Sequence, residues 1–354
     1  MNKCFLKSAR FTCLLLLITA QSLADNLNKQ PALEQLMQAR IQWEAQSQKG
    51  DVEASAKLGA LYLSGSLGSP DFIKARKYLA LSAETDLSAR LAYGHLLMNG
   101  LGGKADLAAA EQFFAKAAAQ GSLEGQYLKA KLILGRNASE TEVRSAVNGI
   151  SSAANKGFPP ALSTIAEFYR TGTFLEQSPE KAIEYFLKAV DGGYTEALST
   201  VAEMYLFAEL SSANIEKAED FYRQAISQGV KSARYSFAFL LYNKEPNNKD
   251  LMSEAYRVAR VAASAWDERC QYLLGLMYYE GKAVSRDNEQ AHFWLDLAAS
   301  AGVFEAHHIR ALAAKALTKE QISKVKIRAR EWFDENHGRP HVHQSISNST
   351  HRYK

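Results

Sequence analysis

The sequence predicts an all-α fold, a right-handed superhelical solenoid of about seven to eight antiparallel helix pairs of about 36 residues each. Three observations predict this class. One pattern of small and aromatic residues recurs every 36 residues, and two separate columns of small residues keep one register along the chain. Within a copy, apolar residues also follow the spacing of a helix face.

The period is clearest between Gly157 and Gly229, where two copies of the pattern lie end to end and meet at Gly193. Each element of the first copy recurs 36 residues later in the second. The paired elements are Ala161 and Ala197, Ala166 and Ala202, Tyr169 and Tyr205, Ala182 and Ala218, Tyr185 and Phe221, and Ala189 and Ala225. Self-similarity at this period is typical of stacked helical repeats.

Two columns of small residues extend this register along the chain. The first-helix column is Gly59, Gly94, Ala130, Ala166, Ala202, Ala238, Gly275 and Ala311. The second-helix column is Ala75, Ala110, Ala146, Ala182, Ala218, Ala255 and Ala291. Both columns change their spacing by one residue in corresponding copies, so they belong to one repeat. We expect the helix backbones to approach closely at these positions.

Local signals mark where the helices of a copy begin and end. Glycines such as Gly65 and Gly172 end the first helix, where a left-handed residue is easily accommodated. The second helix then begins at a capping residue, as in Ser178-Pro179-Glu180. An aromatic residue of the second helix is expected to fill the space between repeats, and these residues are Tyr78, Phe113, Tyr185, Phe221 and Trp294.

This pattern resembles the Sel1-like repeat, a relative of the tetratricopeptide repeat, from about Ala39 to Gly302. The residues that carry the resemblance are Leu58-Gly59, Tyr62, Gly65, Lys74-Ala75 and Tyr78, and again Leu274-Gly275, Tyr278, Gly281, Ala291, Trp294, Ala298-Ala299 and Gly302. The resemblance implies a protein that mediates protein assembly, often in the bacterial periplasm and in envelope, secretion, motility or virulence systems.

Two copies depart from the pattern. The third has Ile133 in place of the first-helix Tyr and Gly149 in place of the second-helix aromatic. The sixth has residues 243–249 in place of a Gly-rich turn. We expect these two copies to pack less regularly than the others.

The ends of the chain predict further segments. Lys3, Lys7 and Arg10 precede the apolar run 11–20, which small residues follow, as in a secretory signal peptide cleaved after Ala24. The predicted segments are a signal peptide at 1–24, an N-terminal capping helix at 25–50, Sel1-like repeats at 51–302, a degenerate repeat with a C-terminal capping helix at 303–336 and a disordered His-containing tail at 337–354. The mature protein is then periplasmic or secreted, with no membrane insertion.

The net charge bears on the class of partner, and the cysteine content bears on disulfide bonds. Removal of residues 1–24, which hold three basic and no acidic residues, lowers the net charge from +4 to about +1. A charge this small gives no reason to expect nucleic acid as a partner. Cys270 is the one cysteine left, so the mature chain forms no intramolecular disulfide.

Each candidate for chemistry has a structural alternative. Ser178 to Lys181 matches the S-x-x-K motif of β-lactamases, but it lies where every copy starts its second helix, so a helix cap is favoured. Cys270 lies in a column of small residues and is expected to be a buried thiol. His337, His341, His343 and His351 suit a transition metal, but a flexible tail loses entropy when it is ordered. We predict no enzyme activity, cofactor or metal.

The remaining candidate is a surface on the concave, first-helix side of repeats six and seven. Its predicted partner-binding residues are Arg234, Tyr235, Phe239, Tyr242, Arg269, Tyr272 and Tyr279. Tyr and Arg most often anchor interfaces. The alternative is that some of these tyrosines only fill grooves between repeats.

The leading hypothesis is an exported, non-enzymatic scaffold that holds a protein or peptide partner on this surface. A second hypothesis is a binder of an envelope glycan, peptidoglycan or an exopolysaccharide, which stacks on the tyrosines. A β-lactamase-like hydrolase is the weakest of the three.

Overall fold

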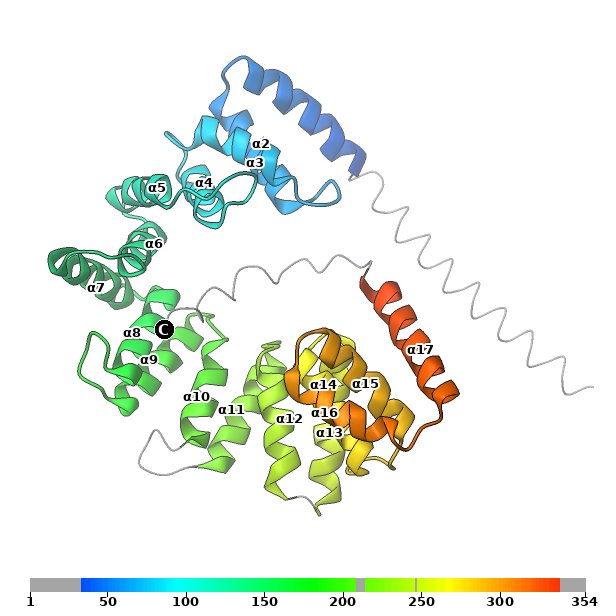
Figure 1. Ribbon diagram of the computed structural model, residues 1–354. Coiled ribbons are helices and arrows are strands. Elements are labelled where there is room, and N and C mark those ends of the chain that lie inside the picture. The colour runs from blue at the N-terminus through cyan, green and yellow to red at the C-terminus, as the bar shows by residue number, and fades with distance from the viewer. Residues whose placement is uncertain (1–32, 208–213, 246, 338–354) are drawn as a thin grey trace, which may run out of the picture. The chain divides into compact units, whose positions relative to one another are not determined.

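The computed structural model describes residues 33–207, 214–245 and 247–337 of the 354-residue chain. These residues form α-helices joined by short turns, and none of them lies in a strand (Figure 1). The predicted all-α solenoid of helix pairs is therefore confirmed. The predicted signal peptide at 1–24 and the tail from 338 onward lie outside the described residues.

The helices follow one another in antiparallel pairs. A first helix covers residues 33–48. It is followed by α2 Val52–Ser64, α3 Phe72–Ser82, α4 Leu87–Asn99, α5 Leu107–Ala119, α6 Leu123–Leu134, α7 Glu140–Asn155, α8 Pro159–Thr171, α9 Pro179–Asp191, α10 Ala197–Leu206, α11 Ile215–Ser227, α12 Ala233–Lys244, α13 Lys249–Ser264, α14 Glu268–Glu280, α15 Asn288–Ser300, α16 Phe304–Ala314 and α17 Lys319–His337. The chain divides into two compact units between Ile165 and Ala166, inside α8.

Small residues let the two helices of a pair approach closely, as the first-helix column predicts. A Cβ atom added to Gly59 on α2 would lie 2.5 Å from Leu79 Cγ on α3. One added to Gly275 on α14 would lie 2.6 Å from Leu295 Cγ on α15. Both distances are too short for real carbon contacts, so these positions have no room for a side chain.

Paired rings fill the space beside this contact. The ring of Tyr62 stacks on that of Tyr78 with 5.8 Å between centroids, and Tyr205 stacks on Phe221 at 5.6 Å. In each pair one ring comes from the first helix and one from the second. Stacked aromatic pairs of this kind add roughly 0.5–1.5 kcal/mol to the energy of area burial.

The predicted caps are present. Ser178 Oγ accepts a hydrogen bond from the Lys181 backbone N–H at 3.3 Å, which starts α9. The side chain of Asp71 likewise accepts from the Lys74 N–H at 3.0 Å and starts α3. Gly65 ends α2 in the left-handed conformation, with φ of 68°. Local sequence therefore determines where these helices begin and end.

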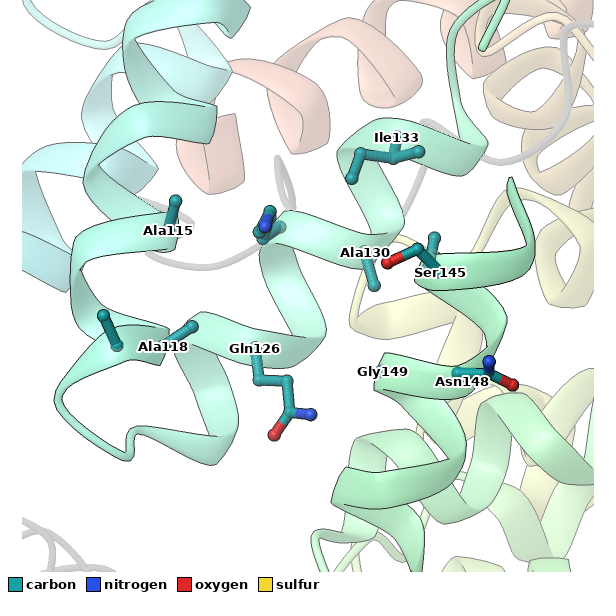
Figure 2. A pocket seen from close by; sticks show the side chains of 11 residues that line it. Ala115, Ala118, Gln126, Ala130, Ile133, Ser145, Asn148 and Gly149 are labelled. Atoms are coloured by element: carbon teal, nitrogen blue, oxygen red, sulfur yellow. The ribbon is translucent and has the colours of Figure 1, made fainter. Parts of the chain in front are cut away.

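The third copy has a hollow where the ring pair is missing. The space has a volume of about 590 Å³ and lies among α5, α6 and α7 (Figure 2). Gly149 on α7 and Ile133 on α6 line it. The expectation that this copy packs less regularly is confirmed at this position.

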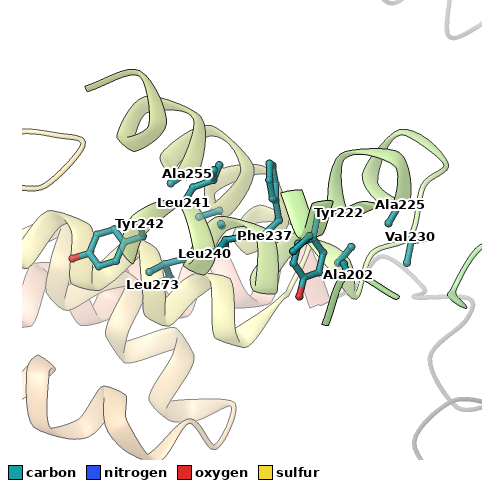
Figure 3. Packing of buried hydrophobic residues seen from close by; sticks show 14 of the residues in the cluster. Ala202, Tyr222, Ala225, Val230, Phe237, Leu240, Leu241, Tyr242, Ala255 and Leu273 are labelled. Atoms are coloured by element: carbon teal, nitrogen blue, oxygen red, sulfur yellow. The ribbon is translucent and has the colours of Figure 1, made fainter. Parts of the chain in front are cut away.

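The largest buried cluster of the second unit extends across successive helices from α10 to α14. Figure 3 shows part of the cluster, in which Tyr222 on α11 lies beside Phe237 on α12 and Leu241 lies beside Ala255 on α13. Tyr222 and Leu241 have no exposed surface. Each pair therefore buries its apolar face against its neighbour, which is how a solenoid builds a core.

The final copy differs from the predicted register. Ala311 of the first-helix column is exposed, whereas Ala306 and Ala313 of α16 are fully buried against α15. The reason is that α17 packs on α15 through Val325 and Ala329 instead of pairing with α16. The prediction that Ala311 lies at a close helix contact is therefore wrong.

Candidate functional site

A group of aromatic side chains on α12 and α14, half-buried or exposed, contains several of the predicted partner-binding residues. Tyr235 and Phe239 lie four residues apart on α12, on one face of the helix, with ring centroids 5.7 Å apart and planes 24° apart. The guanidinium of Arg269, on α14, lies 5.6 Å from the centre of the Tyr235 ring. Phe239 is 43% exposed. We call Tyr235, Phe239, Arg269 and Tyr272 the aromatic surface.

Tyr272 joins this surface from α14. Burial raises the pKa of the Tyr235 phenol, the positive charge of Arg269 opposes the rise, and the Tyr272 phenol adds to it. Burial also raises the pKa of Tyr272, and the carboxylate of Glu305 adds to the rise. The two half-buried tyrosines are therefore influenced by the cation Arg269 and by the carboxylates of Glu305 and Glu280.

Glu305 and its neighbour Phe304 lie near this surface, although the repeat pattern did not predict them. Glu305 lies in the first turn of α16 and acts on both phenols of the aromatic surface. Phe304 is 84% exposed. The sequence carries a signal for Glu305, because Tyr235, Tyr272 and His308 recur at 37- and 36-residue steps and a residue three positions before His308 lies on the same face of a helix.

Tyr242 does not belong to this surface, so its prediction as a partner-binding residue is corrected. It is only 4% exposed, and its O–H donates a hydrogen bond to Glu280 Oε2 at 2.6 Å. Burial and this carboxylate both raise its pKa. The ammonium group of Lys282 lies 5.1 Å from the ring centre. For Tyr242 the alternative, groove filling between repeats, is confirmed.

Tyr279 and Arg234 also lie apart from the aromatic surface. Tyr279, like Tyr272, is half-buried against the cluster of α15 and α16, but its ring contacts Arg286, whose guanidinium lies 5.2 Å from the ring centre. Arg234 lines a separate hollow among α11, α12 and α13. Of the seven predicted residues, the structure therefore brings Tyr235, Phe239 and Arg269 into contact, and Tyr272 acts on the Tyr235 phenol from α14.

The alternative candidates for chemistry have structural roles. Cys270 has no exposed surface, and burial raises the pKa of its thiol. The Lys181 ammonium lies 5.3 Å from the Tyr169 ring centre, while Ser178 caps α9. Both structural interpretations, the buried thiol and the helix cap, are confirmed.

Within the described ranges, no three His, Cys, Asp or Glu side chains gather as metal ligands would. Nor does any helix there combine the length and apolar character needed to cross a bilayer.

A family model described as the Sel1 repeat matches the chain at five places. The matched residues are 52–85, 87–122, 159–194, 195–230 and 269–303. The third copy and the sixth copy lie between these matches, and they are the two whose sequences depart from the pattern. No curated protein matches the chain.

Solved structures similar to this chain are also helical-repeat proteins. A Sel1 repeat protein from Oxalobacter formigenes is 25% identical with a TM-score of 0.57, and the match covers 78% of this chain and 80% of that one. A protective antigen present in uropathogenic Escherichia coli strains, displaying an SLR fold, is 20% identical with a TM-score of 0.56, covering 82% and 70%. Yeast Tom70 is 16% identical with a TM-score of 0.52, covering 84% and 60%.

Proposed function

Because the chain belongs to the Sel1 repeat family, whose five matched repeats span half of it, we propose that it is an exported scaffold that binds a partner protein through its aromatic surface. Sel1 repeat proteins generally mediate protein–protein interaction, and their fold is typically a non-catalytic scaffold. The partner is a peptide or protein segment held against α12, α14 and the start of α16.

The observation that carries the proposal is the stacked, partly exposed pair of Tyr235 and Phe239 beneath Arg269. Aromatic and Arg side chains supply most of the energy at protein interfaces. Here each ring already packs against a neighbouring side chain, so its rotamer freedom is restricted before a partner binds. Pre-organisation of this kind strengthens binding because less side-chain entropy is lost.

The charges near the tyrosine rings suit a polypeptide ligand. Arg269 contributes a cation beside Tyr235, and Glu305 contributes a carboxylate that acts on both tyrosines. A polypeptide segment can pack an apolar side chain on the rings and can form polar contacts with Arg269 and Glu305 through its backbone groups. A surface with a buried apolar centre and a polar rim is the usual anatomy of a protein interface.

Export is part of the same proposal. It is supported by the basic residues, short apolar run and small residues that end at Ala24. The protein then acts in the periplasm or outside the cell, in an envelope process. A glycan ligand is the alternative, favoured by the 43% exposed ring of Phe239, because a flat aromatic face is also a platform for stacking.

The test is a crosslinking pull-down from the host envelope with three proteins. They are the wild type, the double variant Tyr235→Ala with Tyr272→Ala, and the control Phe207→Ala, which removes a 69% exposed ring at the end of α10. We expect the wild type and the control to recover a protein band that the double variant loses, with unchanged helical circular dichroism. Equal recovery by all three contradicts the proposal, and recovery of glycan alone supports the alternative.

A further inference from the structure

Two copies of the repeat lack an aromatic residue at one second-helix position, and both carry a hollow there. The other copies have Tyr78, Phe113, Tyr185, Phe221 and Trp294 at this position. Gly149 occupies it in the third copy and Val258 in the sixth. The hollow at Gly149 has a volume of about 590 Å³, and the hollow at Val258 about 440 Å³.

The two hollows are equivalent in position but differ in chemistry. Around Gly149 the walls are small and mostly uncharged, with Ala118, Ser145 and Asn148 among them (Figure 2). Around Val258 the floor is apolar, and the walls carry three arginines and one carboxylate. These residues are Ile226, Phe237, Val258 and Val261, with Arg223, Arg234, Arg257 and Glu254. We call this second space the α11–α13 hollow.

The α11–α13 hollow has an excess of positive charge. Arg223 is held by both carboxylate oxygens of Glu254, with Nη2 at 2.8 Å from Oε2, and its guanidinium lies 4.9 Å from the Phe237 ring centre. Arg257 Nη2 lies 3.7 Å from Glu254 Oε1. Among the lining residues Glu254 is therefore the carboxylate shared by two of the three arginines, while Glu219 and Asp220 of α11 also act on Arg223.

Arg234 is the third arginine, and Arg90 is its counterpart in the second copy. Arg90 is 2% exposed and donates to the Ala83 carbonyl oxygen at 2.8 Å, to the Glu84 carbonyl oxygen and to Gln120 Oε1 at 2.5 Å. Arg234 occupies the same register position on the wall of the hollow. Among the described residues, no carboxylate or carbonyl oxygen accepts a hydrogen bond from its guanidinium.

We propose that the α11–α13 hollow binds an acidic segment of a partner protein. An apolar side chain of the segment occupies the space above Val258, and flanking carboxylates pair with Arg234 and Arg257. Charge complementarity is the argument for this occupant, because charge-assisted bonds to arginine are the strong ones. The chain's own residues 338–354 do not fit, since they contain three basic residues and no acidic ones.

This hollow is separate from the aromatic surface. Arg234 and Phe237 line it from α12, whereas Tyr235 and Phe239 of the same helix belong to the aromatic surface. At 100° per residue, the two pairs lie on different faces of α12. A partner segment can therefore occupy the α11–α13 hollow while the aromatic surface is also occupied.

The test is fluorescence anisotropy with a labelled acidic probe, a peptide in which one leucine is flanked on each side by two glutamates. A peptide with lysines in place of the glutamates is the control ligand. Val258→Tyr restores the ring that other copies have and fills the hollow, and Arg234→Ala removes the unpaired cation. Gly149→Tyr is the matched control, because it fills the equivalent hollow of the third copy.

We expect the wild type and Gly149→Tyr to bind the acidic probe saturably and to ignore the lysine peptide. Val258→Tyr and Arg234→Ala are each expected to weaken binding at least about tenfold with unchanged circular dichroism. Absence of saturable binding to the acidic probe overturns the proposal. Equal binding of the lysine peptide, or unchanged affinity in both variants, also overturns it.

Discussion

The guanidinium of Arg269 lies over the ring of Tyr235, 5.6 Å from its centre, so that α14 holds an aromatic side chain of α12. This contact joins the first helices of two successive copies on the side where the proposed partner binds. It orders Tyr235 while leaving Phe239, the ring stacked beside it, 43% exposed.

Arg269→Ala is expected to affect partner binding more than stability. A cation–π contact at an exposed site contributes only about 0.5–1 kcal/mol, so the free energy of unfolding in urea should fall by no more than that. Recovery of the partner should fall clearly, because an anchoring side chain is lost and Tyr235 is less ordered. A loss of stability without a loss of binding contradicts the role of Arg269 in the aromatic surface.

Two glycine substitutions are expected to change stability in opposite directions. Gly149→Ala should raise the free energy of unfolding by about 1 kcal/mol, because alanine is the better helix former. The new Cβ would lie 3.8 Å from Ala130 Cβ, an ordinary contact. Gly59→Ala should lower the free energy of unfolding by about 1–3 kcal/mol, because the new Cβ would lie only 2.5 Å from Leu79 Cγ. Urea unfolding of both variants measures the difference, and equal effects contradict the packing described.

His292 is expected to make the protein less stable in mild acid. It is 3% exposed, and burial lowers its pKa below the ordinary 6.5, while Asp296 opposes the shift and Arg310 and Lys326 add to it. The unfolded chain therefore binds the proton more readily, so stability is present above about pH 6.5 and is lost as the pH falls below it.

His292→Leu is the variant that isolates this effect. The difference in the free energy of unfolding between about pH 7.5 and pH 5.5 should be smaller for His292→Leu than for the wild type. His307→Gln, on the exposed side of α16, serves as the control and should behave as the wild type. If the free energy of unfolding depends on pH equally in all three proteins, groups other than His292 cause the acid sensitivity.

Tyr242 is expected to matter for stability and not for partner binding. Tyr242→Phe keeps the buried ring and loses the hydrogen bond to Glu280, which should cost about 1 kcal/mol. Tyr242→Ala leaves a cavity and should cost about 3–5 kcal/mol. Denaturant unfolding gives both values, and the pull-down should recover the partner equally with Tyr242→Phe and the wild type. If Tyr242→Phe fails to recover the partner, Tyr242 takes part in binding and this prediction is wrong.

The helix pairs could be predicted from sequence because their causes are local or periodic. Gly59 and Gly275 recur at the register where two backbones meet, and each would clash if it carried a Cβ atom. Ser178 lies directly before α9 and caps it. Such signals need no knowledge of distant contacts, so the period and the cap residues were sufficient.

Exposure within the candidate site could not be predicted in the same way. Tyr235 and Tyr242 are seven residues apart, about two turns of one helix, so the repeat pattern alone predicts the same exposure for both side chains. Tyr242 is buried because Glu280 accepts its hydrogen bond and the turn with Lys282 packs over its ring. Ala311 is exposed because α17 packs on α15. Both outcomes depend on neighbouring elements that the repeat pattern does not specify.

Site-specific photocrosslinking tests the central claim most directly. A photoreactive benzoylphenylalanine replaces Phe239 in one protein and Phe207, an exposed ring outside the aromatic surface, in the other. We predict a discrete, protease-sensitive adduct from position 239 in the host envelope and none from position 207. Equal adducts from both positions, or no protein adduct from position 239, would contradict a protein-binding role for the aromatic surface.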